Sequence, residues 1–133
     1  MKGQHSAILL GLLMLTATGC AALVAGAGAG AGVYTYVTGE LKRTYLVDYD
    51  TAVTATQASL EALRIKVTER QSGATETTIS GMRTDETPVV TVVRFVGAST
   101  TEISVRSGVV GYWDKSGSEL IHATIVKRLP RTG

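Results

Sequence analysis

The chain has 133 residues, of which 44% are hydrophobic and 5% aromatic, and its 13 basic and 11 acidic side chains give a net charge of +2. This length suits one folded domain, and the small charge and few aromatic rings exclude the basic, stacking surface that binds nucleic acid. One cysteine and two histidines offer little material for a metal or catalytic centre, so we expect no metal, no cofactor and no enzyme activity.

The N-terminus has the features of an export signal. Lys2 and His5 precede an uncharged apolar run at residues 7–15, and small residues then lead to Gly19 and Cys20. A positive start, a short apolar stretch and small residues before a cleavage point are typical of signal peptides. The segment resembles that of bacterial prolipoproteins, in which the cysteine takes a diacylglyceryl thioether and becomes the first residue. This resemblance implies a signal peptide at residues 1–19, cleavage between Gly19 and Cys20, and lipid on Cys20.

Two other interpretations of this segment stay open. Cys20 can be a small buried hydrophobe, since free cysteine is among the most buried residue types. The chain can also keep an uncleaved membrane helix, because no charged residue lies between Lys2 and Glu40 and that length is enough to span a bilayer.

A Gly-Ala run follows the proposed lipid site at residues 24–33. Each glycine inside a helix costs about 1 kcal/mol relative to alanine, so an isolated helix is disfavoured. The run can be a flexible tether, a small-residue packing segment or a silk-like strand. We expect residues 20–38 to form a lipidated, membrane-proximal segment in which Tyr34 and Tyr36 lie either in the headgroup zone or on one face of a strand.

The folded domain is expected at residues 39–133, beginning with a strand at residues 40–47. Its alternation places Leu41, Tyr45 and Val47 on one face. Asp48 and Asp50 are candidate caps for a helix of about fourteen residues, with an apolar stripe at Val53, Leu60 and Leu63. Alternation resumes on both sides of Ser72-Gly73-Ala74, which predicts a β-hairpin over residues 65–84.

A second hairpin and a second helix complete the domain. Residues 89–96 and 101–107 alternate around a Gly-Ala-Ser turn, with Ile103 and Val105 expected inward. Ser116 and Glu119 have the spacing of a capping box, which predicts a helix over residues 117–129. Its expected apolar stripe comprises Leu120, Ile121, Thr124, Ile125 and Leu129.

This order of strand, helix, four strands and helix predicts an α+β fold. The economical way to bury both helical stripes is a two-layer sandwich, with a mostly antiparallel sheet of about five strands and both helices packed on one face.

With these elements placed, the mature chain resembles an uncharacterised family of small Gram-negative lipoproteins, the domain of unknown function 3568. The segments that carry the resemblance are residues 19–22, the Gly-Ala run, residues 34–36, residues 39–45 and residues 101–106. Tyr112 and Trp113 depart from the family pattern by interrupting the loop before the last helix. The resemblance implies lipidation and the architecture, and no catalytic residue. Ala21 after the cysteine implies sorting to the periplasmic face of the outer membrane.

Few side chains of the domain are candidates for a site. His122 is expected to be a surface or partly buried histidine on a helix, and Asp85 and Glu86 to be solvated acids of a turn. We expect Glu40, Lys42 and Arg43 on the solvent face or edge of the first strand, where charges discourage aggregation.

Tyr112 and Trp113 are the best candidates for contact with a partner, because aromatic residues are enriched in interface hot spots. The other interpretation is that the indole of Trp113 caps the core beneath a loop. The sequence does not indicate the oligomeric state.

We therefore expect a lipid-anchored envelope protein with a structural or protein-interaction role, in contact with the membrane and with an envelope protein partner. The alternative is a carrier of a small apolar ligand or lipid, which would need a cavity lined by Val92, Phe95, Ile103 and Leu120. An enzyme would need His122 to face a cleft beside an acid and a hydroxyl.

Overall fold

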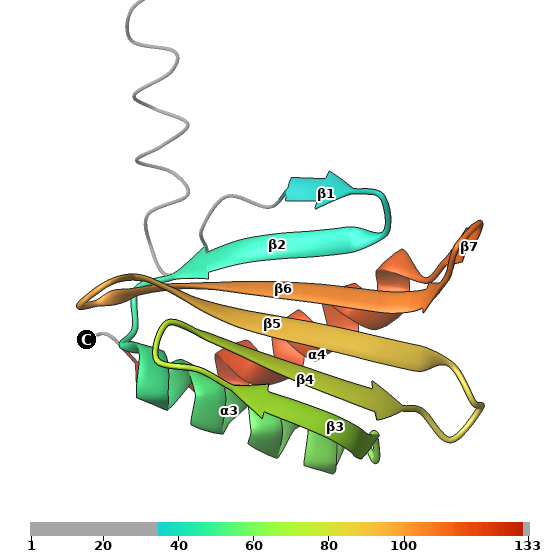
Figure 1. Ribbon diagram of the computed structural model, residues 1–133, viewed down its shortest axis with the longest axis horizontal. Helices are drawn as coiled ribbons and strands as arrows, with labels where there is room; N and C mark the ends of the chain where they lie inside the picture. Colours follow the sequence, from blue (N-terminus) through green and yellow to red (C-terminus); the bar gives the residue numbers. More distant parts are fainter. Residues whose placement is uncertain (1–34, 132–133) are drawn as a thin grey trace, which may run out of the picture.

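Two helices and a seven-stranded antiparallel sheet form the fold of the computed structural model, which describes residues 35–131 (Figure 1). The α+β class predicted from the sequence is confirmed. In chain order the elements are β1 (Thr35–Val37), β2 (Glu40–Tyr45), α3 (Tyr49–Ala62), β3 (Lys66–Ser72), β4 (Glu76–Met82), β5 (Pro88–Gly97), β6 (Thr100–Val109), β7 (Tyr112–Trp113) and α4 (Lys115–Arg128).

The strand order is β1-β2-β6-β5-β4-β3, with β7 paired to the end of β6. Both predicted hairpins are present, as β3–β4 and β5–β6. The first long strand, β2, does not pair with β3; it lies against β6, so that Leu41 faces Val105 and Tyr45 faces Thr101. Segments about sixty residues apart in the chain therefore meet at the centre of the sheet.

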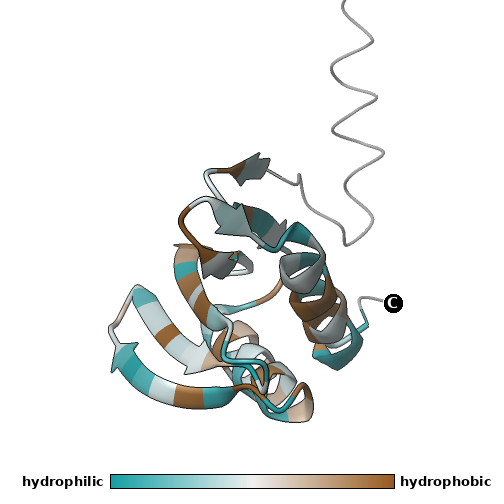
Figure 2. Ribbon diagram, turned by 90° about the vertical axis from the view of Figure 1, so that its right-hand side faces the viewer, coloured by the Kyte–Doolittle hydropathy of each residue, from teal (hydrophilic) through white to brown (hydrophobic). Residues whose placement is uncertain are grey.

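One face of the sheet shares a single core with both helices. Alternate residues of β5 and β6, including Val89, Val93, Ile103 and Val105, are buried together with Leu60 of α3 and Ile121 and Ile125 of α4. The alternation of apolar and polar bands along the strands is visible in Figure 2. The inward orientation predicted for Ile103 and Val105 is confirmed, because strand side chains point to opposite faces in turn.

The first helix matches its prediction. The Asp48 side chain accepts a hydrogen bond from the Thr51 amide and caps the 14-residue helix α3, so one of the four free amides of its first turn is satisfied. Val53 and Leu60 face the core, and Leu63 packs at its margin.

The sheet has more strands than the five predicted. The additional ones are β1, with three residues, and β7, with two. Neither is long enough to show alternation in the sequence, so each is defined only by the strand it pairs with. Because β1 begins at Thr35, the sheet also extends beyond the domain start predicted at Gly39.

The predicted capping box of α4 is wrong. The helix begins at Lys115, and its cap is Asp114, whose carboxylate accepts from the Gly117 amide at 2.9 Å. The buried face of the helix also differs from the predicted stripe: Leu120 is 54% exposed, whereas Ile121, His122 and Ile125 are buried.

The expected solvent position of Arg43 is also wrong. Arg43 lies between Leu41 and Tyr45 on the buried face of β2, because strand alternation places residues 41, 43 and 45 on one side. Its guanidinium carbon lies 5.1 Å from the centre of the Tyr45 ring, a cation–π distance. Glu40 and Lys42, on the other face, are partly exposed as predicted.

Candidate functional site

One end of the sheet carries a projecting hairpin with exposed apolar side chains. We call residues 109–112, which run from the last residue of β6 to the first residue of β7, the hairpin tip, and the part of the molecule around it the hairpin end. Val109 is 51% exposed, Val110 85% and Tyr112 83%. In Figure 1 the β6–β7 hairpin extends beyond the body of the sheet. Large apolar side chains with this exposure, gathered on one projection, are typical of a contact surface.

Glycines shape this hairpin. Gly108 and Gly111 have φ values of +105° and +87°, which side-chain-bearing residues rarely adopt. A Cβ at Gly108 would lie 2.4 Å from the Tyr112 carbonyl oxygen, whereas a Cβ at Gly111 would meet nothing within 4 Å. Glycine at position 108 therefore permits both the positive φ and the close approach of the two strands. Glycine at position 111 is needed for the positive φ alone.

The indole of Trp113 holds the base of the hairpin against the β1–β2 turn. A Cβ at Gly39 would come within 2.1 Å of the Trp113 ring, so the ring lies directly on the glycine backbone. The Arg106 guanidinium carbon lies 5.4 Å from the centre of the indole. Of the two residues proposed as partner contacts, Tyr112 is exposed, and Trp113 is partly buried in contacts within the molecule.

The start of α4 is fixed to the β4–β5 loop beside the same hairpin. Asp114 accepts a charge-assisted hydrogen bond of 2.6 Å from Arg83 while it caps the helix. The two contacts join the loop, the helix N-terminus and the strand β7 that directly precedes it. The segment that follows the tip is thus held in place by contacts with the β4–β5 loop and with helix α4.

A groove of about 480 Å³ runs beside the hairpin end, between β1 and α4. Its lining residues are Tyr36, Leu41, Lys115, Glu119 and Ala123. The Lys115 ammonium lies 5.3 Å from the centre of the Tyr36 ring and 3.9 Å from a Glu119 carboxylate oxygen. The groove at the hairpin end is therefore lined by one pair of opposite charges together with tyrosine, leucine and alanine side chains.

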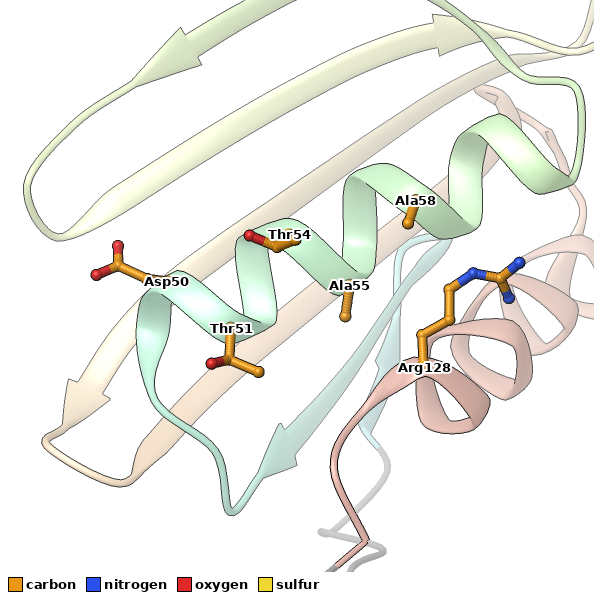
Figure 3. A pocket seen from close by; sticks show the side chains of 6 residues that line it. All are labelled: Asp50, Thr51, Thr54, Ala55, Ala58 and Arg128. Atoms are coloured by element: carbon orange, nitrogen blue, oxygen red, sulfur yellow. The ribbon is translucent and has the colours of Figure 1, made fainter.

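A second groove, of about 470 Å³, separates α3 from α4. In Figure 3 Ala55 and Ala58 point from α3 toward Arg128 of α4, and Asp50 points away. Small side chains and one arginine line a shallow channel here. None of the residues proposed from the sequence as site residues lies in it.

His122 is fully buried, more deeply than predicted, within a polar network of the core. Its Nε2 lies 2.8 Å from the Leu41 carbonyl oxygen, and its Nδ1 lies 2.6 Å from the Tyr45 hydroxyl. A carbonyl only accepts, so Nε2–H donates to Leu41 and Nδ1 accepts from Tyr45. Burial lowers the pKa of His122 to about 4; the charge of Arg43 acts in the same direction, and the hydrogen bond with Leu41 opposes both.

His122 therefore does not face either groove. Its ring is fully covered and lines neither groove described above. Asp85 and Glu86 lie in the exposed β4–β5 turn as predicted, where Asp85 accepts from the Thr87 amide at 3.1 Å.

The four residues expected to line a ligand cavity do not face one space. Ile103 is in the core, but Val92 lies between two buried neighbours and points to the opposite face of the sheet. Phe95 and Leu120 are exposed. The carrier hypothesis thus loses the cavity on which it was based.

The two valines of the hairpin tip were not among the residues predicted to form a site. Val109 and Val110 stand between two glycines in a loop, and the available signal was an apolar pair at a place where turns are normally polar. The cleavage site at Gly19 and Cys20, the Gly-Ala run and Tyr34 lie outside the described residues.

Within residues 35–131, no helix is long and apolar enough to cross a membrane, and no group of three or more histidine, cysteine, aspartate or glutamate side chains is placed to hold a metal ion.

Comparison with protein families finds that residues 5–128 match the family DUF3568, described as a protein of unknown function. A comparison with curated proteins finds no match. The family match includes the whole sheet, the hairpin end and all of α4 as far as Arg128. The resemblance inferred from the sequence is thereby confirmed at the level of the domain family, and the chain belongs to the DUF3568 family.

Proposed function

We propose that the chain is a membrane-anchored envelope lipoprotein whose α+β domain has a structural or interaction role. The observation that carries the proposal is the position of the single cysteine, Cys20, directly after an apolar segment that ends in small residues. Acyl chains contribute about 0.8 kcal/mol per buried methylene, so two or more of them hold a protein on a membrane stably.

The hairpin end supports the interaction role. The base of its exposed apolar tip is held by Trp113 against the β1–β2 turn and by Asp114 at the start of α4, so contact with another component of the envelope would be made by a largely preorganised surface. Exposed valine and tyrosine side chains there contribute nothing to the core and are available for such contact.

The first test is the mass of the mature N-terminus in membrane fractions. We expect the normal chain to begin at Cys20 and to carry a lipid-sized mass increment. Cys20→Ser should lack the increment and leave the membrane fraction, whereas the control Thr16→Ser should behave as the normal chain does. A normal chain that begins at Met1 without acyl groups would contradict the proposal.

The location proposed is the periplasmic face of the outer membrane. The support is Ala21 directly after the proposed lipid site, a residue that generally permits passage to that membrane in the lipoproteins that the N-terminus resembles. Separation of the two membranes on a density gradient tests it, with recovery in the inner membrane as the contradicting result.

A further inference from the structure

We propose that the hairpin tip inserts into the interfacial region of the bilayer to which the chain is anchored. This inference rests on the proposed function, because it takes the lipid on Cys20 as the tether. The proposed partner of the hairpin end is therefore a lipid surface.

The chemistry of the tip suits the boundary between headgroups and acyl chains. Residues 109–112 are Val-Val-Gly-Tyr, without a charged side chain, and Val110 and Tyr112 are more than four-fifths exposed. Valine favours hydrocarbon, and a tyrosine ring with its hydroxyl in the headgroup layer is typical of membrane interfaces.

The surroundings of the tip fit the same partner. Lys115 and Tyr36 lie together at its base, with the ammonium 5.3 Å from the ring centre. The Lys115 side chain is more than half exposed, although it also approaches Glu119. An exposed lysine beside tyrosine, below an apolar tip, can meet phosphate groups while the valines lie deeper.

The size of the tip favours a bilayer over a protein. A stable protein interface needs about 800 Å² from each partner and an anchor residue such as tryptophan or arginine. Here Trp113 and Arg106 are already packed against each other, and three exposed side chains remain. A tethered domain meets its own membrane at high effective concentration, so these few side chains suffice for a persistent contact.

The tether is long enough for the tip to reach the membrane. Thr35, at which the sheet begins, is the fifteenth residue after Cys20, and fifteen residues span at most about 50 Å. The tip lies at the end of β6, a strand of ten residues, or about 33 Å. The domain can therefore turn its hairpin end toward the bilayer without strain on the tether.

A dye at the tip tests the proposal. Cys20 is the single cysteine of the chain and is blocked when acylated, so Val110→Cys can be labelled at one place with a nitrobenzoxadiazole dye. The matched control is Ser99→Cys, which is exposed in the β5–β6 turn at the other end of the sheet. Both lipidated full-length chains are placed in vesicles of phosphatidylethanolamine and phosphatidylglycerol, with and without nitroxide-labelled lipid.

We expect the dye at position 110 to emit at shorter wavelength and to lose about half of its emission or more to nitroxide lipid, because an interfacial segment lies within about 10 Å of the headgroups. The dye at position 99 should do neither. Tyr112→Asp, added to the labelled Val110→Cys chain, should restore the emission, because a carboxylate opposes insertion. Circular dichroism should show the same folded domain in all three chains.

Equal behaviour of the two dyes on chains that co-float with the vesicles would overturn the inference and leave the proposed function intact. The same labelled chains are also measured in native membranes; a spectral shift of the dye at position 110 that occurs there but not in the vesicles, and that nitroxide lipid does not quench, would also overturn the inference, in favour of a protein partner. A chain that carries no acyl groups and does not float would overturn the proposed function, and the inference with it.

Discussion

At the scale of single residues, the imidazole of His122 is a titratable group held inside the core. Its two ring nitrogens are occupied by Leu41 and Tyr45, and the folded protein holds the ring neutral because burial lowers its pKa to about 4. In the unfolded chain the same group has the ordinary pKa of about 6.5. Proton uptake below pH 6.5 therefore favours unfolding.

The stability of the domain should fall as the pH falls. Stability from His122 is fully present above pH 6.5 and is lost progressively toward pH 4, and from pH 7 to pH 5 the loss is about 2 kcal/mol. Urea unfolding at the two pH values measures it. His122→Gln cannot titrate, so most of this difference should disappear. An unchanged pH dependence in that variant would contradict the assignment.

Gly39 and Gly111 form a natural pair for a second test. Both have positive φ values, +78° and +87°, so alanine at either position should cost about 1 kcal/mol through backbone strain. At Gly39 the added Cβ also collides with the Trp113 ring. We expect Gly39→Ala to lower the free energy of unfolding by clearly more than Gly111→Ala, as measured by chemical denaturation. Equal losses would show that the indole does not lie against the turn.

Sequence alternation predicted the orientation of most strand residues but not that of Arg43. Ile103 and Val105 were placed correctly because hydrophobicity and position agree. For Arg43 they disagree, since its charge favours solvent and its position on β2 points inward. The position decides, and the guanidinium is accommodated beside the Tyr45 ring.

At the scale of elements, the start of α4 depends on one carboxylate. Asp114 caps the helix and pairs with Arg83, whereas the predicted cap, Ser116, is an exposed residue inside the helix. Asp114→Ala should therefore cost about 1–2 kcal/mol, typical of a lost cap. Ser116→Ala should be close to neutral. Thermal unfolding of the two variants distinguishes the caps, and a larger loss for Ser116→Ala would restore the original prediction.

Long elements were predictable and short ones were not. Helix α3 and strands β3 to β6 each contain enough residues to reveal a period. Strands β1 and β7 contain three and two residues, too few for a pattern. The candidate site depends on β7, so Tyr112 was proposed from its chemistry, while the exposure of Val109 and Val110 became visible only in the structure.

At the scale of the whole molecule, the contact surface and the core are separate. Val110 and Tyr112 at the hairpin tip are exposed, whereas Ile103, in the interior of β6, is fully buried. The double variant Val110→Ser and Tyr112→Ser should leave the free energy of unfolding within about 0.5 kcal/mol of the normal value. Ile103→Ala should cost about 2–5 kcal/mol. Denaturant titrations compare them; a large loss in the double variant would show that the tip supports the fold.

Strand order was the part of the architecture that the sequence left open. Hairpins between neighbours follow from short turns, but the pairing of β2 with β6 joins distant segments, and no local pattern specifies it. The shared apolar face of both strands is compatible with several orders, so the order follows from contacts between segments far apart in the chain.

The central position of β6 determines when the sheet can form during synthesis of the chain. Glu40 in β2 finds its partner, Arg106, only after most of the chain has been synthesised. Until the ribosome has passed that point, β1 and β2 have no neighbour on their inner side, and the nascent polypeptide cannot close its sheet. The pairing of β2 at the centre of the sheet can therefore form only late in elongation, once β6 has been synthesised.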